Sequence, residues 1–368
     1  MKVCCVFNYN PLYRYPIFSA IADNFDCDFY FGDTVFQPLK AFDATKLKGF
    51  QHFIYAKKTG VKAFIWHSQI KDIFRKEYTH YILTGEAASL VNWLIIFYAR
   101  LTGRKVFGWT HGAKDYPKNW RRRWLMQAFY RPLSGILMYN RYNCQYMEAL
   151  GCKKERLFVI HNSLDSAVQT KIYQSLAPSD IYQKHFGNSN PTLIYIGRIQ
   201  RVKKVDMILE AMKLLEKQGK HVNLVVVGAN VDDDSFEQRI EELKLSDRVW
   251  MYGPCFDEQT NSELIYNAAA CVSPGNIGLT CIHVLSYGTP VITNDNFNTQ
   301  MPEFEAVVEG KTGSFFREND VEDLARKIDS WISITEQQRD ECRSVARQTI
   351  EQEWSVDYQI DLLKKVLV

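Results

Sequence analysis

Long apolar runs are missing from this chain. The longest apolar stretch in a predicted helix, Trp93–Ala99, is far shorter than the ~20 residues that a membrane-spanning helix needs. The amino terminus passes from Val3–Phe7 directly into the polar Asn8–Asn10 and lacks the apolar core of a signal peptide. We therefore expect a cytoplasmic protein without a membrane-spanning segment.

Charge of one sign is also scarce. The chain has 45 Lys and Arg against 42 Asp and Glu, a net charge of +3, which is too weak a field to indicate a nucleic-acid partner. Its nine cysteines form no C-x-x-C pair and no Cys/His cluster at zinc spacing, a pattern typical of reduced thiols. We expect no nucleic acid among the partners.

What the chain does have is a repeated alternation of strands and helices. At 368 residues and roughly 150 residues per domain, two domains fit the length. The alternation predicts parallel sheets with helices on both faces. We interpret residues 1–165 as a first Rossmann-like domain, 166–190 as a linker, 191–345 as a second Rossmann-like domain, and 346–368 as a helix that packs back on the first domain.

The most informative stretch is the glycine-containing turn Pro274–Thr280, followed by an apolar run and then by Tyr287–Thr293. A strand, a glycine turn and a helix that opens on free backbone amides are features that doubly wound domains use to bind phosphate. The amides of Gly278, Leu279 and Thr280 are the candidates for that contact. This stretch predicts a nucleotide site in the second domain.

A second phosphate feature lies upstream in the same domain. Gly197 and Arg198 follow the predicted strand 193–196, and Lys203 comes six positions after the glycine. Alone, such a pair is more often a surface turn, but cations beside a helix amino terminus suit a diphosphate. Because both features belong to one domain, together they predict a phosphate site more strongly than either does alone.

The order of these features resembles the retaining glycosyltransferases of family 4, which have the GT-B fold. The resemblance is strong over 192–334 and looser in the first half. It rests on Gly197-Arg198 with Lys203, then Tyr252-Gly253-Pro254, Leu264–Ala269, Ser273-Pro274, Gly278-Leu279, Gly288–Ile292, Pro302-Glu303 and Gly313, and in the first half on His111-Gly112 and Ile160–Asp165.

The resemblance implies a two-domain α/β enzyme whose nucleotide-sugar donor lies between the domains. Arg198 and Lys203 would neutralise the donor diphosphate, so neither a metal nor another cofactor is implied. Anomeric retention would follow from attack of the acceptor on the face from which the nucleotide diphosphate departs. The sequence does not identify the base of the donor; UDP is favoured and GDP remains open.

The chain also departs from this family. Most members carry two glutamates eight positions apart, one facing the donor sugar and the other the ribose, where this chain has Gly275 and His283. An imidazole at His283 can still hydrogen-bond a ribose, although a helix residue packed under the loop is the competing interpretation. Contacts to the donor sugar would then pass to other residues, for which the candidates are Asn276, Asn294, Asp295 and Glu303.

Three residues of the first half are further candidates. Arg14 follows the first strand, where the family's loop approaches donor and acceptor, and a surface cation is the competing interpretation. His111 ends a strand and is the best candidate in this half for contact with the transferred sugar. Glu86 would bind the acceptor hydroxyl, unless it only stabilises the dipole of the following helix.

A helix at 120–131 mixes tryptophans with arginines, a combination that suits contact with an anionic bilayer. A core helix with solvated arginines is the alternative.

We hypothesise a metal-independent transferase at the inner face of the cell membrane that moves a sugar onto an oligosaccharide or a lipid-linked glycan in surface polysaccharide synthesis. The competing hypotheses are a catalytically inactive sugar-nucleotide-binding scaffold and a GT-B epimerase acting on a UDP-sugar.

Overall fold

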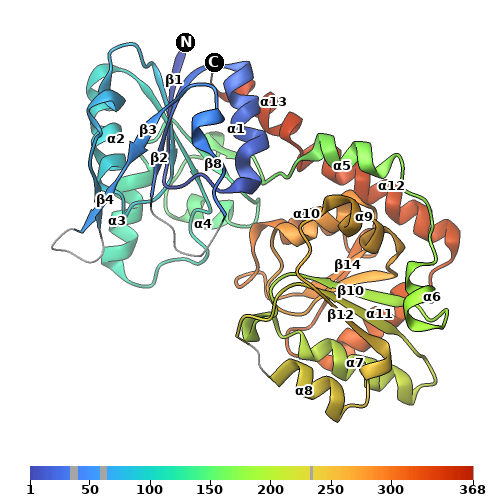
Figure 1. The fold of residues 1–368 in the computed structure, drawn as a ribbon. Helices are drawn as coiled ribbons and strands as arrows, with labels where there is room; N and C mark the ends of the chain where they lie inside the picture. The colour runs from blue at the N-terminus through green and yellow to red at the C-terminus, as the bar shows by residue number, and fades with distance from the viewer. Residues whose placement is uncertain (34–39, 59–63, 233–234, 368) are drawn as a thin grey trace. The chain divides into compact units, whose positions relative to one another are not determined.

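The computed structural model describes residues 1–33, 40–58, 64–232 and 235–367. The chain divides into two compact units, each of which is described by itself. The first unit consists of Met1–Leu164 together with Ser355–Val368, and the second of Asp165–Trp354 (Figure 1).

The first unit is built on a parallel sheet of seven strands. The strand order is β3-β2-β1-β6-β7-β8-β9, and the switch between β1 and β6 makes this a doubly wound sheet. The strands are β1 (Lys2–Phe7), β2 (Asp26–Gly32), β3 (Phe50–Ile54), β6 (His80–Thr84), β7 (Lys105–Thr110), β8 (Gly135–Met138) and β9 (Leu157–Val159). A short antiparallel pair, β4 (Ala56–Lys58) and β5 (Ile65–His67), stands outside this sheet.

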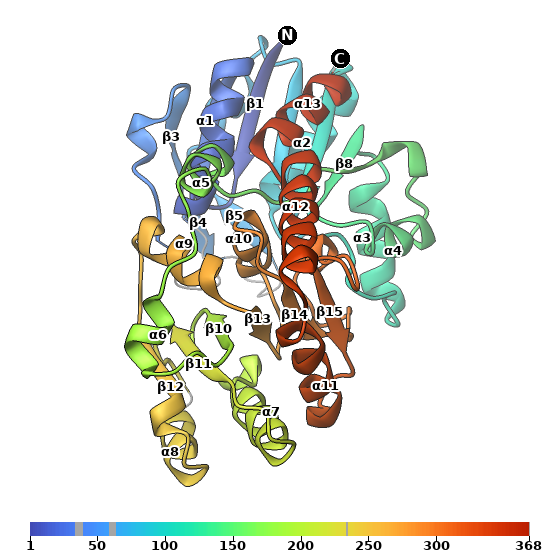
Figure 2. The same ribbon diagram turned by 90° about the vertical axis from the view of Figure 1, so that its right-hand side faces the viewer.

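Helices cover both faces of this sheet because successive strand residues point to opposite sides. One face packs against α1 (Tyr15–Asn24) and α13 (Val356–Val366), which lie side by side in both views (Figures 1 and 2). The other face packs against α2 (Leu90–Thr102), α3 (Trp120–Tyr130) and α4 (Cys144–Ala149). Each face therefore has its own apolar core.

The second unit repeats this design with six parallel strands in the order β12-β11-β10-β13-β14-β15. The strands are β10 (Thr192–Ile196), β11 (Asn223–Val227), β12 (Val249–Gly253), β13 (Ala270–Ser273), β14 (Val291–Asn294) and β15 (Gly313–Phe316). Strand β11 is buried along its whole length, as expected for a strand covered on both faces.

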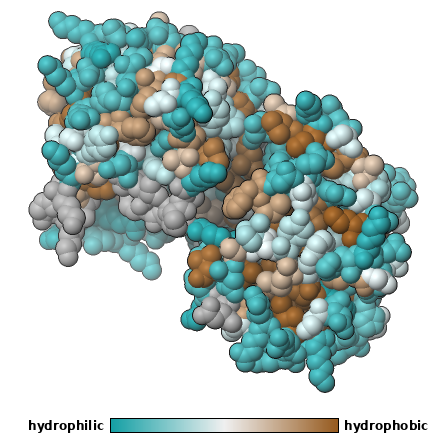
Figure 3. Space-filling view, in the orientation of Figure 1, coloured by the Kyte–Doolittle hydropathy of each residue, from teal (hydrophilic) through white to brown (hydrophobic). Residues whose placement is uncertain are grey.

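Three helices pack on one face of the second sheet: α7 (Asp206–Lys217), α8 (Ser235–Glu242) and α11 (Val321–Ile332). The other face carries α9 (Glu258–Asn267) and α10 (Leu279–Ser286), against which α5 (Ser166–Tyr173) and α12 (Glu336–Glu353) pack. The visible surface around α8 is mainly hydrophilic (Figure 3), because the apolar stripe of that helix, Phe236 and Ile240, is buried.

Two segments differ from the sequence interpretation. Residues 166–190 do not form a separate linker but contribute α5 and α6 (Ile181–Phe186) to the second unit. The hydroxyl of Tyr182 on α6 donates to the carbonyl of Leu264 at 2.5 Å, which fixes this helix against α9. The tail also divides at Ser355, so that residues 346–354 belong to α12 in the second unit and only α13 packs in the first.

Within the described residues, none of the helices combines the length and apolar character needed to cross a membrane.

Candidate nucleotide site

The two phosphate features predicted from the sequence meet at the carboxyl edge of the second sheet. Strand β10 ends at Ile196 and is followed by Gly197 and Arg198, whereas β13 ends at Ser273 and leads through a loop into α10. The two strands are hydrogen-bonded neighbours, so the turns that follow them lie side by side. Ligands of doubly wound domains bind at this edge.

A very close backbone approach shapes the turn after β10. A Cβ atom added at Gly228, which follows β11, would lie 1.8 Å from the carbonyl oxygen of Gly197, so only glycine fits there. Gly197 itself has a φ of 146°, which side-chain-bearing residues rarely adopt. These glycines allow the chain to turn sharply and leave Arg198 exposed at the sheet edge.

Lys203 joins the two turns. The sequence suggested that Lys203 starts the next α-helix. In the structure it is instead the last residue of the short 3-10 helix Arg201–Lys203. Its ammonium donates to the backbone oxygen of Asn276 at 2.6 Å and to the side-chain oxygen Oδ1 of the same residue at 2.7 Å. The backbone N–H of Gly275 donates to the carbonyl of Lys203 at 2.8 Å. Both the side chain and the backbone of Lys203 are therefore hydrogen-bonded to the loop after β13.

Gly275 is required by this packing. A Cβ atom at this position would lie 2.3 Å from the carbonyl oxygen of Val202 and 2.5 Å from the Cα atom of Lys203. No side chain is compatible with such distances to backbone atoms. The glutamate expected by family resemblance is therefore sterically excluded here, and its place is filled by the backbone of the lysine-bearing turn.

Burial and charge tune Lys203. Burial is the main cause that lowers its pKa to about 8, the positive charge of Arg198 adds to this effect, and Glu303 opposes it. Glu303 lies in the 3-10 helix Pro302–Ala306, is only 2% exposed, and has Oε2 at 3.9 Å from the Cβ position of Gly278. Both cations and this carboxylate thus influence one another at the start of α10.

Helix α10 begins at Leu279 with Gly278 as its N-cap. The first N–H groups of an α-helix have no acceptor within the helix, so the amides at this end are available to an anion. The hydroxyl of Thr280 donates to the carbonyl of Ile196 at 3.1 Å, which ties this helix start to the end of β10. The Thr280 hydroxyl is therefore occupied, while its backbone amide remains a candidate.

Two amides that hold the preceding loop were not identified as such from the sequence. Gln300 accepts from the N–H of Ile277 at 2.7 Å and donates to the hydroxyl of Thr293 at 3.0 Å. Asn294, expected as an alternative sugar contact, is buried and donates to the carbonyls of Pro274 and Gly275, both at 2.9 Å. Their roles are visible only in three dimensions, because neither residue has a distinctive spacing in the sequence.

His283 does not stand alone. Its Nε2 atom lies 3.0 Å from Oε1 of Glu258, the first residue of α9. The same carboxylate oxygen accepts from the hydroxyl of Tyr287 at 2.6 Å and from the amide of Gln169 at 3.3 Å. Burial would raise the pKa of Glu258, but the hydrogen bonds and charge of His283, with Tyr287 and Gln169, outweigh it and lower that pKa.

Glu258 is therefore an ionised carboxylate with one oxygen, Oε1, fixed by three donors, and none of its hydrogen bonds within the described chain involves Oε2. The sequence interpretation missed this residue because it lies 25 positions before its histidine partner. Only the packing of α9 against α10 reveals the pair.

In the first unit, Arg14 and His111 lie at the corresponding carboxyl edge, after β1 and β7. Arg14 is not a surface cation, since it is 8% exposed and its guanidinium lies 4.4 Å from the ring of Trp109. Burial, Lys114 and Arg14 lower the pKa of His111 to about 4, so its imidazole is neutral near pH 7. The ring centroids of His111 and Tyr139 are 4.5 Å apart.

Glu86 is half-buried in the loop between β6 and α2. Burial raises its pKa, and its Oε1 atom accepts from the side chain of Asn8 at 3.1 Å. It lines a small enclosed space together with His67 and Asn92. Acceptor binding by Glu86 stays a prediction.

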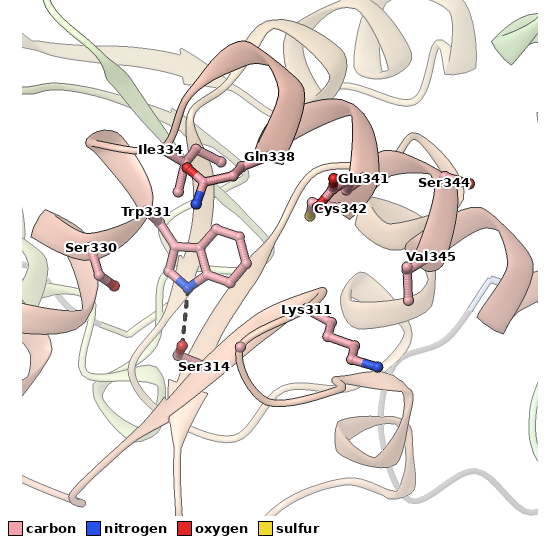
Figure 4. Close-up of a pocket in the computed structure, with 11 residues that line it drawn as sticks. Lys311, Ser314, Ser330, Trp331, Ile334, Gln338, Glu341, Cys342, Ser344 and Val345 are labelled. Carbon is pink, nitrogen blue, oxygen red and sulfur yellow. Dashed lines mark hydrogen bonds between the residues drawn. The ribbon is translucent and has the colours of Figure 1, made fainter.

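A larger pocket of about 620 Å³ opens elsewhere in the second unit (Figure 4). It is lined by α11, α12 and the turn that precedes β15, which places it at the amino edge of the sheet, opposite to the phosphate features. Its indole N–H, from Trp331, already donates to the hydroxyl of Ser314 at 3.0 Å.

Among the described residues, no group of three or more His, Cys, Asp or Glu side chains is placed to hold a metal ion.

Comparison with known proteins agrees with this geometry. Residues 179–349 match the family model of the glycosyl transferases group 1. HepE of Anabaena, solved in complex with UDP, superposes with a TM-score of 0.74 at 16% identity, covering 100% of this chain and 99% of that one. The fold is that of the GT-B glycosyltransferases.

The GT-B likeness extends to proteins with other names. The lipopolysaccharide outer core galactosyltransferase WaaB in its apo form gives a TM-score of 0.69 at 16% identity, with coverage of 100% of this chain and 99% of that one. A poly(glycerol-phosphate) alpha-glucosyltransferase of Bacillus subtilis (strain 168) is 19% identical over 219 residues, which are 59% of this chain and 30% of that protein. The present chain thus matches less than a third of the length of this relative.

Proposed function

We propose that this chain is a retaining, metal-independent glycosyltransferase that uses a nucleoside diphosphate sugar. The observation that carries the proposal is the joined pair of turns in the second unit, where Lys203 and Arg198 flank the first amides of α10. Two cations and a helix amino terminus favour the negative charge of a diphosphate. The match to group 1 glycosyl transferases over 179–349 and the GT-B neighbour solved with UDP support it.

The chemistry follows from where the charge develops. When the bond between the sugar and the diphosphate breaks, negative charge grows on the departing phosphate oxygen. Preorganised cations and amides stabilise that charge more strongly than they stabilise the intact donor. Arg198 and Lys203 then supply what a divalent cation supplies in metal-dependent transferases. An acceptor hydroxyl attacks on the same face, its oxygen bonds to the sugar as the bond to the diphosphate breaks, and its proton passes to the departing phosphate oxygen.

Glu258 is our candidate for the ribose contact that a glutamate at position 283 makes in the resembling family. His283 fixes Oε1 of this carboxylate, which leaves Oε2 to accept the ribose hydroxyls. A glutamate at position 283 would instead face the ionised Glu258 and repel it. We infer that the histidine and the displaced carboxylate replace the family arrangement together.

We propose a sugar-containing acceptor, either an oligosaccharide or a lipid-linked glycan, in the assembly of a surface polysaccharide. The names of the related proteins, a poly(glycerol-phosphate) glucosyltransferase and a lipopolysaccharide galactosyltransferase, motivate this class. A UDP-sugar is our preferred donor because HepE was solved with UDP.

A thermal-shift series tests donor binding, because a ligand that binds only the folded protein raises its melting temperature. We expect UDP and one UDP-sugar to raise it, GDP, ADP and dTDP to have little effect, and Arg198→Ala to abolish the shift. Arg239→Ala is the matched control, since Arg239 pairs with Glu210 and Glu242 on the surface of the same unit. No shift with any of the nucleotides would contradict the proposal.

A further inference from the structure

Arg14 of the first unit is a buried cation with an unusual environment. Its guanidinium carbon lies 4.4, 4.9, 5.4 and 5.9 Å from the ring centroids of Trp109, Phe18, Phe7 and Tyr139. The side chain is 8% exposed, so it has lost most of its hydration. Aromatic faces attract a cation, but they accept no strong hydrogen bonds.

Two nitrogen atoms of this guanidinium have no acceptor within the part of the chain that the structure describes. Its Nε and Nη2 atoms are buried and have no hydrogen-bond partner among the described residues, and none of the ion pairs found there includes Arg14. A buried charge without a counter-ion is costly, and unpaired buried donors add to that cost.

His111 shares this environment. Its ring packs on Tyr139 at 4.5 Å between centroids, the same ring that lies 5.9 Å from the guanidinium of Arg14. The Nδ1 atom of His111 is also buried without a partner among the described residues. Arg14 and His111 thus both pack on Tyr139 at the carboxyl edge of the sheet, after β1, β7 and β8, and both have buried hydrogen-bonding atoms without a partner among the described residues.

We propose that Arg14 and His111 bind a phosphate group of a substrate. The planar fork of a guanidinium matches two phosphate oxygens, and a neutral imidazole can donate a further hydrogen bond. The inference rests on the proposed transferase function and adds that the first unit recognises an anionic group. The acceptor is the substrate that would carry this phosphate.

Histidine NMR of the full chain with labelled imidazoles gives a local readout. His111→Gln assigns the His111 signals, and sn-glycerol 3-phosphate is titrated into the protein saturated with UDP. We expect the His111 signals to shift and the affinity to fall about tenfold or more in Arg14→Met, since a charged hydrogen bond to phosphate is lost. Arg14→Lys, which keeps the charge but not the fork, should lie between the two.

Arg104→Met is the matched control. Arg104 also lies over an aromatic ring, at 4.9 Å from Tyr98, but its guanidinium already donates to the carbonyls of Tyr78 and Lys76. This variant should bind glycerol 3-phosphate as the wild type does. Loss of binding in both variants would trace the effect to a general loss of packing and overturn the assignment.

A shift caused by glycerol 3-phosphate on top of UDP supports the assignment to an acceptor phosphate, whereas a shift complete with UDP alone contradicts it. If neither probe moves the His111 signals, or if both move them equally in Arg14→Met, the proposal is wrong. Because glycerol 3-phosphate can also be titrated without UDP, a failure of donor binding leaves this test intact.

Discussion

Lys203 in the second unit combines a fixed position with a lowered pKa. It is held by Asn276 through two hydrogen bonds, and burial together with Arg198 lowers its pKa to about 8. Near pH 7 its ammonium is still mostly protonated. A bound diphosphate would favour the protonated form further, so ligand and proton should bind together.

From this coupling we predict the pH dependence of UDP binding. Affinity should stay nearly constant up to about pH 7 and should fall as the pH rises through about 8, approaching about tenfold per pH unit, because a proton must then be taken up on binding. Calorimetric titration between pH 6.5 and 9.5 measures this. Lys203→Arg keeps its charge throughout this range and should flatten the curve; a flat curve for the wild type would refute the coupling.

Gly275 gives a second prediction at the residue scale. Gly275→Glu restores the glutamate expected from family resemblance, but its Cβ would collide with the backbone of Val202 and Lys203. We expect the free energy of unfolding to fall by about 1–3 kcal/mol, as for overpacked sites, and UDP binding to be lost. Denaturant unfolding and calorimetry measure the two effects.

Two companion variants separate the causes in this test. Gly275→Ala adds only the Cβ atom and should reproduce most of the loss in stability. Asn276→Asp adds a carboxylate beside Lys203 without a new steric demand and should keep the fold. If Gly275→Glu were as stable as the wild type and bound UDP more tightly, the steric explanation would be wrong.

At the scale of elements, the alternation of strands and helices could be predicted from the sequence, because buried parallel strands and amphipathic helices have clear periods. Helix α3 was expected at 120–131 and is found at Trp120–Tyr130. The segment 166–190, expected as a linker with some helix, belongs to the second unit because its short helices α5 and α6 pack on α9 and α10. Short helices of this kind have weak signals in sequence.

Helix α3 leads to a prediction about membranes. Trp120 and Trp124 are 65% and 64% exposed, and Arg121 and Arg122 between them are exposed as well. Exposed tryptophans beside arginines suit the interface of an anionic bilayer. We expect the chain to sediment with phosphatidylglycerol vesicles, and the double variant Trp120→Ser/Trp124→Ser to bind at least about tenfold more weakly, given about 1.5–3 kcal/mol for each large apolar side chain buried.

Phe256→Ser is the control for this surface, because Phe256 is 95% exposed but belongs to the second unit. It should sediment with the vesicles as the wild type does. Equal binding of all three proteins, or equal binding to uncharged phosphatidylcholine vesicles, would show that α3 is not a docking surface for anionic lipid.

At the scale of the whole molecule, the GT-B class could be predicted because the order of glycines, prolines and cations along 192–334 is more specific than any one motif. The hydrogen-bond partners of the site residues could not be predicted from the sequence. Glu258 pairs with His283 and Gln300 holds Ile277 across elements that are distant in sequence. Pairing of this kind depends on tertiary packing, which a single sequence without aligned relatives does not report.

The most direct test of the account is whether the chain transfers a sugar. Proton NMR of the purified protein with a UDP-sugar and a glycan acceptor, in the presence of a chelator, follows the release of UDP and the anomeric signal of the product. We expect UDP release that depends on the acceptor, with the anomeric configuration of the donor kept in the product. Tight donor binding without release would contradict transfer and favour a binding scaffold, whereas conversion of the UDP-sugar without acceptor would favour an epimerase.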